Sequence, residues 1–161
     1  MPSVEGANGY YPELPRFLDQ AAIESLVTAA LDSEIKSHLE PDAIPIVMFS
    51  GGVDSGLIAY RLSALGRMDT VMFNVSFGQN DKEAMVAREM ANRLRLNCIE
   101  LRYPGKWDVL TSPGAVYPVP FGDYSAPPAA FLASEICDRY AGQKVVVFDG
   151  TGADGCFGLQ S

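Results

Sequence analysis

The stretch that decides the fold is residues 44–65, IPIVMFSGGVDSGLIAYRLSAL. Residues 44–49 are a short apolar run, which is typical of a strand buried on both faces. From residue 54 onward apolar side chains recur at helical spacing, at Leu57, Ile58, Leu62 and Leu65. Gly66 follows as a suitable stop for that helix. The stretch therefore predicts a strand, a tight glycine turn and a helix in direct succession.

Helical and strand-like segments alternate on both sides of this unit. Upstream, apolar residues four apart predict a helix over 17–39, after an irregular arm over 1–16. Downstream we expect strand 70–76, helix 81–95 with Val86, Met90 and Leu94 facing inward, strand 97–103, helix 127–141 and strand 145–148. Such alternation predicts an α/β fold, a doubly wound parallel sheet with helices on both faces, in a single domain of residues 1–161.

Composition excludes several classes of function. Twelve basic and twenty acidic residues give a net charge of -8, which argues against a nucleic-acid partner because that affinity comes mainly from Lys and Arg. No stretch approaches the roughly 20 apolar residues of a bilayer span, and no signal peptide is visible, so we expect no membrane association. Three widely spaced cysteines without a CxxC pair predict a cytoplasmic protein. The single histidine, His38, lies in a polar stretch and is expected to be exposed.

The turn Ser50-Gly51-Gly52-Val53-Asp54-Ser55 has the chemistry of an anion site. Its glycines let the backbone approach a ligand closely, and the helix that follows presents free N–H groups. Asp54 beside a phosphate requires a divalent cation that bridges the two. A plain turn capped by Asp54 or Ser55 is the alternative. The turn lacks the lysine of a Walker A loop and the GxGxxG of a dinucleotide site.

The hexapeptide resembles the PP-loop of the ATP pyrophosphatases, which cleave ATP between the α- and β-phosphates. The segment 149–158, DGTGADGCFG, is similar to the second signature of the asparagine synthetase branch of that superfamily. The resemblance covers roughly residues 17–158. It implies a Rossmann-like three-layer sandwich of the adenine nucleotide alpha hydrolase type. It also implies an ATP-dependent adenylating ligase that activates a carboxylate or carbonyl-type acceptor for attack by ammonia or an amine, with ATP and Mg²⁺ as cofactors.

The resemblance assigns roles to individual positions. The pyrophosphate loop corresponds to Ser50, Gly51, Gly52, Asp54 and Ser55. Adenine-side positions correspond to Met48 and to Asn74 or Val75, and nucleotide-binding glycines to Gly150 and Gly152. The catalytic and metal positions correspond to Asp54 and Asp154, which would share Mg²⁺, and to Thr151. Phe77 either covers the base or packs as core.

The chain also departs from the family pattern. The family usually has Glu, which assists amide formation, at the position of Thr151, and Glu again at Gly155. The family's synthetase half continues past its second motif, so we expect a fragment, a reduced member, or a site completed by a partner subunit or a second copy. Three functions stay open: the adenylating ligase acting on a small-molecule acceptor, a sulfur transferase that uses Cys156, and a nucleotide-binding module without turnover.

Overall fold

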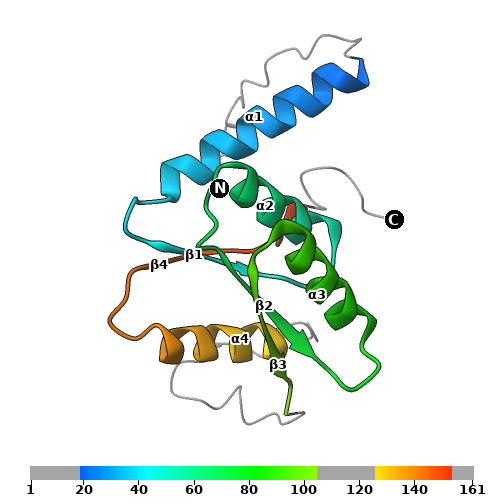
Figure 1. Cartoon of the computed structure of the whole chain (residues 1–161), viewed down its shortest axis with the longest axis vertical. Coiled ribbons are helices and arrows are strands. Elements are labelled where there is room, and N and C mark those ends of the chain that lie inside the picture. The colour runs from blue at the N-terminus through cyan, green and yellow to red at the C-terminus, as the bar shows by residue number, and fades with distance from the viewer. Residues whose placement is uncertain (1–18, 105–125, 154–161) are drawn as a thin grey trace, which may run out of the picture.

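The computed structural model of the chain describes residues 19–104 and 126–153 (Figure 1). Helices and strands alternate as predicted: α1 Gln20–His38, β1 Ile44–Met48, α2 Val53–Ala64, β2 Val71–Ser76, α3 Lys82–Leu94, β3 Asn97–Arg102, α4 Ala126–Arg139 and β4 Val145–Phe148. The arm predicted over 1–16 lies outside the described residues. Within the described part of the chain, no helix is both long enough and apolar enough to cross a bilayer.

The four described strands form one sheet in the order β3-β2-β1-β4, and every neighbouring pair is parallel. The predicted doubly wound parallel sheet is therefore confirmed. From β1 the chain proceeds to β2 and β3 on one side and returns to β4 on the other side. The carboxyl ends of β1 and β4 thus flank the point where the strand order reverses, which is where open α/β sheets bind their ligands.

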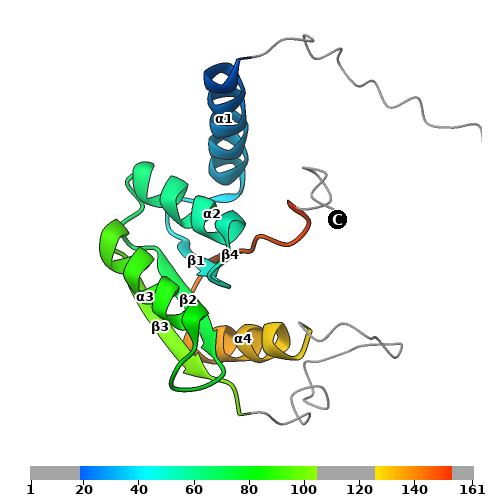
Figure 2. The same cartoon turned by 90° about the vertical axis from the view of Figure 1, so that its right-hand side faces the viewer.

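Helices cover both faces of the sheet, and each face has its own core. Figure 2 shows α2 and α3 on one side of the sheet and α4 on the other. The core under α1, α2 and α3 contains Ile35, Val47, Phe49, Ala59, Leu62, Met72, Ala87, Ala91 and Leu96. The core under α4 contains Ile46, Val71, Phe73, Val75, Leu101, Leu132 and Ile136. Because neighbours in a strand point to opposite faces, each buried strand supplies both cores.

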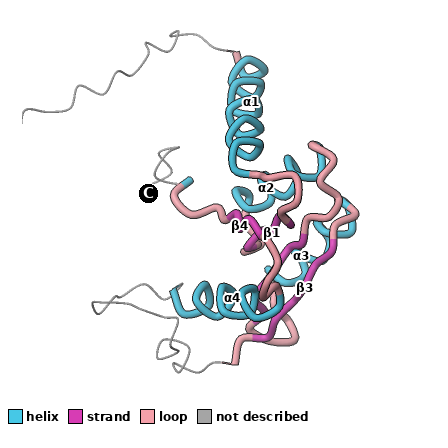
Figure 3. The backbone as a smooth tube through the Cα atoms, turned by 90° about the vertical axis from the view of Figure 1, so that its left-hand side faces the viewer, coloured by secondary structure: helices cyan, strands magenta, loops and turns pink. Residues whose placement is uncertain are grey.

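Two details of the helices differ from the predicted pattern. In α3 the prediction for Val86 was wrong, since it is 45% exposed, and the buried side chains are Ala84, Ala87 and Ala91. These small residues let α3 lie close to the sheet. In α1 the apolar stripe is buried only at its carboxyl end, where Ile35 enters the core. Its amino-terminal part stands clear of the other elements, as Figure 3 shows.

Candidate nucleotide site

A cavity of about 690 Å³ lies at the carboxyl edge of the sheet. That volume falls within the range typical of small-molecule sites. Its described lining comes from the ends of β1, β2 and β4, from the first turns of α2, α3 and α4, and from Tyr103 after β3. The residues that line it are Met48, Phe49, Ser50, Gly52, Asp54, Ser55, Asn74, Val75, Phe77, Glu83, Tyr103, Pro127, Pro128, Ala129, Leu132, Asp149, Gly150 and Thr151.

The loop after β1 has a backbone that requires glycine at Gly51. Its φ is +85°, in the left-handed region, and a Cβ there would lie 3.1 Å from both Cα and Cβ of Glu83. Helix α2 begins directly afterwards with Gly52 as its N-cap, and no side chain caps it. The hydroxyl contacts of Ser50 and Ser55 within the loop are long, at 3.4 Å. The first turn of α2 therefore retains N–H groups that can bind an anion.

Helix α3 begins at the same edge of the sheet, but the side chain of its N-cap residue, Asp81, caps its first turn. Asp81 accepts hydrogen bonds from the N–H groups of Glu83 (2.9 Å) and Ala84 (3.3 Å), and from that of Phe77 (2.7 Å). These bonds, with that from Phe77 the strongest influence, hold the pKa of Asp81 below its usual value. Of these two helices, α2 is therefore the one whose first N–H groups are left open to the cavity.

The loop after β4 lies directly against the first turn of α2. A Cβ on Gly150 would lie 2.9 Å from Cβ of Asp54 and 3.0 Å from the backbone nitrogen of Ser55. The N–H of Thr151 donates to Oδ1 of Asp149 at 2.7 Å, and Gly152 has a φ of +92°. The sequence's two glycine segments, more than ninety residues apart, therefore meet at one wall of the cavity.

The opposite side of the cavity is apolar and aromatic. Phe77 and Tyr103 have ring centroids 5.6 Å apart, and Tyr103 packs in turn on Phe131 at 5.8 Å. Phe77 is 59% exposed, so it is not core packing but part of the cavity rim. Pro127 and Leu132 of α4 complete this wall. The cavity thus has a polar end at the glycine loops and an apolar end beneath the aromatic side chains.

The charges at the cavity are all negative among the residues that the structure describes. Asp54, Glu83 and Asp149 line it, and no described Lys, Arg or His does so. Within the same described ranges, no group of three or more His, Cys, Asp or Glu side chains forms a ready metal cage. His38 is exposed on α1, as expected, and pairs with Glu34 at 2.9 Å. These three carboxylates would repel an anion in the cavity.

Most of the predicted site residues come together at this cavity. Those that line it are Met48, Ser50, Gly52, Asp54, Ser55, Asn74, Val75, Gly150 and Thr151. Gly51 and Gly152 shape the two loops through their positive φ angles. Asp154 and Cys156 lie outside the described residues. The prediction missed Glu83 and Asp149, although first-turn and strand-end positions on a parallel sheet point to this edge.

Comparison with known proteins adds independent findings. A family model described as asparagine synthase matches residues 26–159. A carboxyethyl-arginine beta-lactam-synthase of Streptomyces clavuligerus is 31% identical over 90 residues, which cover 55% of this chain and 17% of that protein. The structure of an NH3-dependent NAD synthetase from Campylobacter jejuni subsp. jejuni NCTC 11168, in complex with the nitrate ion, superposes with a TM-score of 0.60. The superposition covers 89% of this chain and 62% of the NAD synthetase chain, and the two sequences are 14% identical.

Proposed function

The chain belongs to the asparagine synthase family, and from that premise we propose that its cavity binds ATP and supports adenylation of an acceptor. The observation that carries the proposal is the contact of Gly150 with Asp54 and Ser55, which brings both glycine segments to one cavity. The names of the similar proteins, a beta-lactam synthase and an NAD synthetase, are consistent with a ligase. The chain spans 17% of the length of the beta-lactam synthase and 62% of the length of the NAD synthetase.

In this proposal the polyphosphate lies at the polar end of the cavity. The uncapped first turn of α2 supplies N–H donors, and the helix dipole favours negative charge at that position. The hydroxyls of Ser50 and Ser55 make only long contacts within the loop, so both can turn toward a phosphate oxygen. The loop at Gly150 closes the second side, because the absence of a side chain lets its backbone approach closely.

The nucleoside lies at the apolar end. Met48 and Val75 stand at the ends of β1 and β2, and both line the cavity. Val75 is 7% exposed, and its side chain packs in the core under α4, which leaves its main chain for a base. Phe77 and Tyr103 offer aromatic faces next to these positions, and stacking on such faces stabilises a bound base by about 1–3 kcal/mol.

The charge of the cavity supports a requirement for Mg²⁺. Three carboxylates around a triphosphate would repel it unless a cation lies between them. Mg²⁺ is usually held by one or two carboxylates together with substrate phosphates. Asp54, at the first turn of α2, would hold the ion, and Asp154 would be the second ligand. When bound, Mg²⁺ would neutralise the charge of the pyrophosphate as it leaves.

The chemistry that we propose is an in-line displacement at the α-phosphorus of ATP. A carboxylate or carbonyl-type oxygen of the acceptor forms a bond to that phosphorus as the bond to the bridging oxygen of the β-phosphate breaks. The N–H groups of α2 and the loop at Gly150 hold the pyrophosphate while it accumulates charge. Ammonia or an amine then displaces AMP from the adenylated acceptor. Catalysis by this chain's residues is therefore mainly positioning and electrostatic stabilisation.

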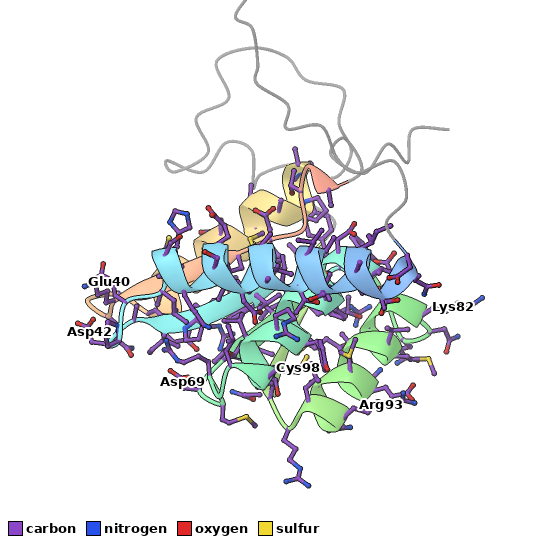
Figure 4. The ribbon with its side chains drawn as sticks, turned by 90° about the horizontal axis from the view of Figure 1, so that it is seen from above. Glu40, Asp42, Asp69, Lys82, Arg93 and Cys98 are labelled. Carbon is purple, nitrogen blue, oxygen red and sulfur yellow. The ribbon has the colours of Figure 1, made fainter. Side chains whose placement is uncertain are left out.

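The test begins with binding of α,β-methylene-ATP, which resists cleavage at the relevant bond, measured by titration calorimetry with Mg²⁺ present. We expect Asp54→Ala to lose binding and to retain its circular dichroism spectrum. Asp42→Ala is the matched control, because Asp42 is an exposed carboxylate that precedes β1. Figure 4 places it at the end of the molecule opposite to Lys82. Equal binding by Asp54→Ala and the unaltered chain would contradict the proposed role.

Turnover is tested separately with labelled ATP, Mg²⁺, ammonium and a mixture of carboxylic acids. AMP and pyrophosphate as products would support the adenylating ligase, and release of ADP would contradict it. Binding without cleavage would instead identify a nucleotide-binding module.

A further inference from the structure

Asn74 is a buried polar side chain with one half of its amide unpaired. It lies in β2, is 1% exposed and lines the cavity. Its Nδ2 donates to the carbonyl oxygen of Phe49 at 2.8 Å, while its Oδ1 has no hydrogen-bond partner within the described residues. The orientation of the amide is fixed, because the carbonyl of Phe49 can only accept. A buried acceptor without a partner costs about 1–3 kcal/mol, so its retention requires a reason.

The amide of Asn74 lies where β1 ends and the glycine loop begins. The last paired residues of β1 and β2 are Met48 and Phe73, and Phe49 N–H still donates to the Phe73 carbonyl at 2.7 Å. At the next carbonyl, that of Phe49, the side chain of Asn74 forms the bond to β1. Ser50 follows immediately as the first residue of the loop. The amide of Asn74 therefore holds the last carbonyl before the glycine loop.

We infer that Asn74 is a positioning residue that connects the bound ligand to the glycine loop. Its Nδ2 holds the carbonyl of Phe49, and its Oδ1 accepts a hydrogen bond from an N–H or O–H donor that arrives with the ligand, directly or through an ordered water. The two bonds reinforce each other, since a donor at Oδ1 polarises the amide and strengthens its bond to Phe49. The identity of the ligand as Mg-ATP rests on the proposed function.

Two substitutions at this position separate the inference from a packing role. Asn74→Leu removes both hydrogen-bonding groups at similar volume. Asn74→Asp places a carboxylate oxygen against the Phe49 carbonyl when ionised but restores a donor when protonated. Burial raises the pKa of a carboxyl, so the protonated form is accessible at mildly acidic pH. Asp54, Glu83 and Asp149 line the same cavity, so the unaltered chain at each pH is the reference.

The measurement is the affinity for Mg-α,β-methylene-ATP at pH 5.5 and pH 8.5, well below the melting temperature of each variant. Compared with the unaltered chain, we expect Asn74→Leu to bind roughly tenfold more weakly at both pH values, the loss of about one hydrogen bond. Asn74→Asp should show that loss at pH 8.5 and recover to within about threefold at pH 5.5. A packing role would lower the melting temperature but leave the affinity of the folded variants unchanged, and that result would overturn the inference.

A measurement on the unaltered chain tests the inference even if the variants do not fold. The side-chain ¹⁵N resonance of Asn74 should move when Mg-α,β-methylene-ATP is added. Failure of that resonance to move while the backbone amide of Gly52 moves would overturn the inference alone. Absence of any binding by the unaltered chain would overturn the proposed function as well, so the two failures are distinguishable.

Discussion

The contact between Gly150 and α2 gives the sharpest prediction, the effect of Gly150→Ala. The added methyl carbon would lie 2.9 Å from Cβ of Asp54 and 3.0 Å from the Ser55 nitrogen. Ordinary carbon–carbon contacts are about 3.5–4.0 Å, so the loop after β4 must retreat by roughly 0.6–1.1 Å. Overpacking of this kind costs about 1–3 kcal/mol of stability. The retreat also separates the two walls of the proposed polyphosphate site, and we expect affinity to fall at least about tenfold, the effect of one lost charge-assisted hydrogen bond.

The assay pairs urea unfolding with calorimetric titration of Mg-α,β-methylene-ATP. Gly66→Ala is the matched control, because Gly66 has a φ of +81° with no neighbour within 4 Å of its added Cβ. Its left-handed backbone costs about 1–2 kcal/mol with alanine, far from the cavity. Gly66→Ala should therefore lose similar stability and keep its affinity. If Gly150→Ala binds as tightly as the unaltered chain, the idea that the two loops act together is refuted.

Three further predictions concern the same edge of the sheet. Gly51→Ala should lose about 1–2 kcal/mol in urea unfolding, because its φ is +85° and Glu83 lies 3.1 Å from the added Cβ, and it should also bind nucleotide more weakly. Gly78 has open space around it and no positive φ, so Gly78→Ala should change the free energy of unfolding by no more than about 0.5 kcal/mol. An equal loss of stability in Gly51→Ala and Gly78→Ala would contradict this reasoning. Asp81→Asn should reduce the acid sensitivity of folding. The hydrogen bonds to Asp81 lower its pKa in the folded state, so this carboxylate stabilises the folded state at pH values above its usual pKa of 3.8. That stabilisation is lost as the pH falls through the lower pKa of the folded state. Urea titrations between pH 3 and pH 7 would test it, and parallel curves for both chains would argue against the cap. Chelation of divalent cations should weaken ATP binding at least about tenfold in calorimetry, because Asp54, Glu83 and Asp149 otherwise repel the phosphates; unchanged affinity would count against Mg²⁺.

The sequence predicted the order and type of the elements because its local signals agreed with the tertiary fold. The apolar run 44–49 and the helical spacing after residue 54 describe the same unit that the structure contains. Periodicity failed at Val86, where three alanines rather than larger residues face the sheet. Alanine contributes little to an apolar stripe, yet close packing of α3 favours it. The size of the side chains that face the sheet depends on the distance between helix and sheet, and the periodicity of the sequence does not give that distance.

The site was predictable where a residue's role follows from its own backbone, as at Gly51. The contact of Gly150 with Asp54 was predictable only as a shared edge, because strand order decides which loops touch. The close approach of Glu83 to Gly51 and the half-paired amide of Asn74 could not be identified in advance. Their positions at the cavity depend on how closely α3 and β2 approach the loop, and side-chain pairing appears only in three dimensions.

The most direct measurement is a titration of the ¹⁵N-labelled chain with Mg-α,β-methylene-ATP, followed through its backbone amide resonances. The prediction is that the amides of Gly51 and Gly52 and those of Gly150 and Thr151 shift together, with a single dissociation constant. Shifts confined to one of the two loops, or different constants for the two, would contradict the claim that they form a single phosphate site.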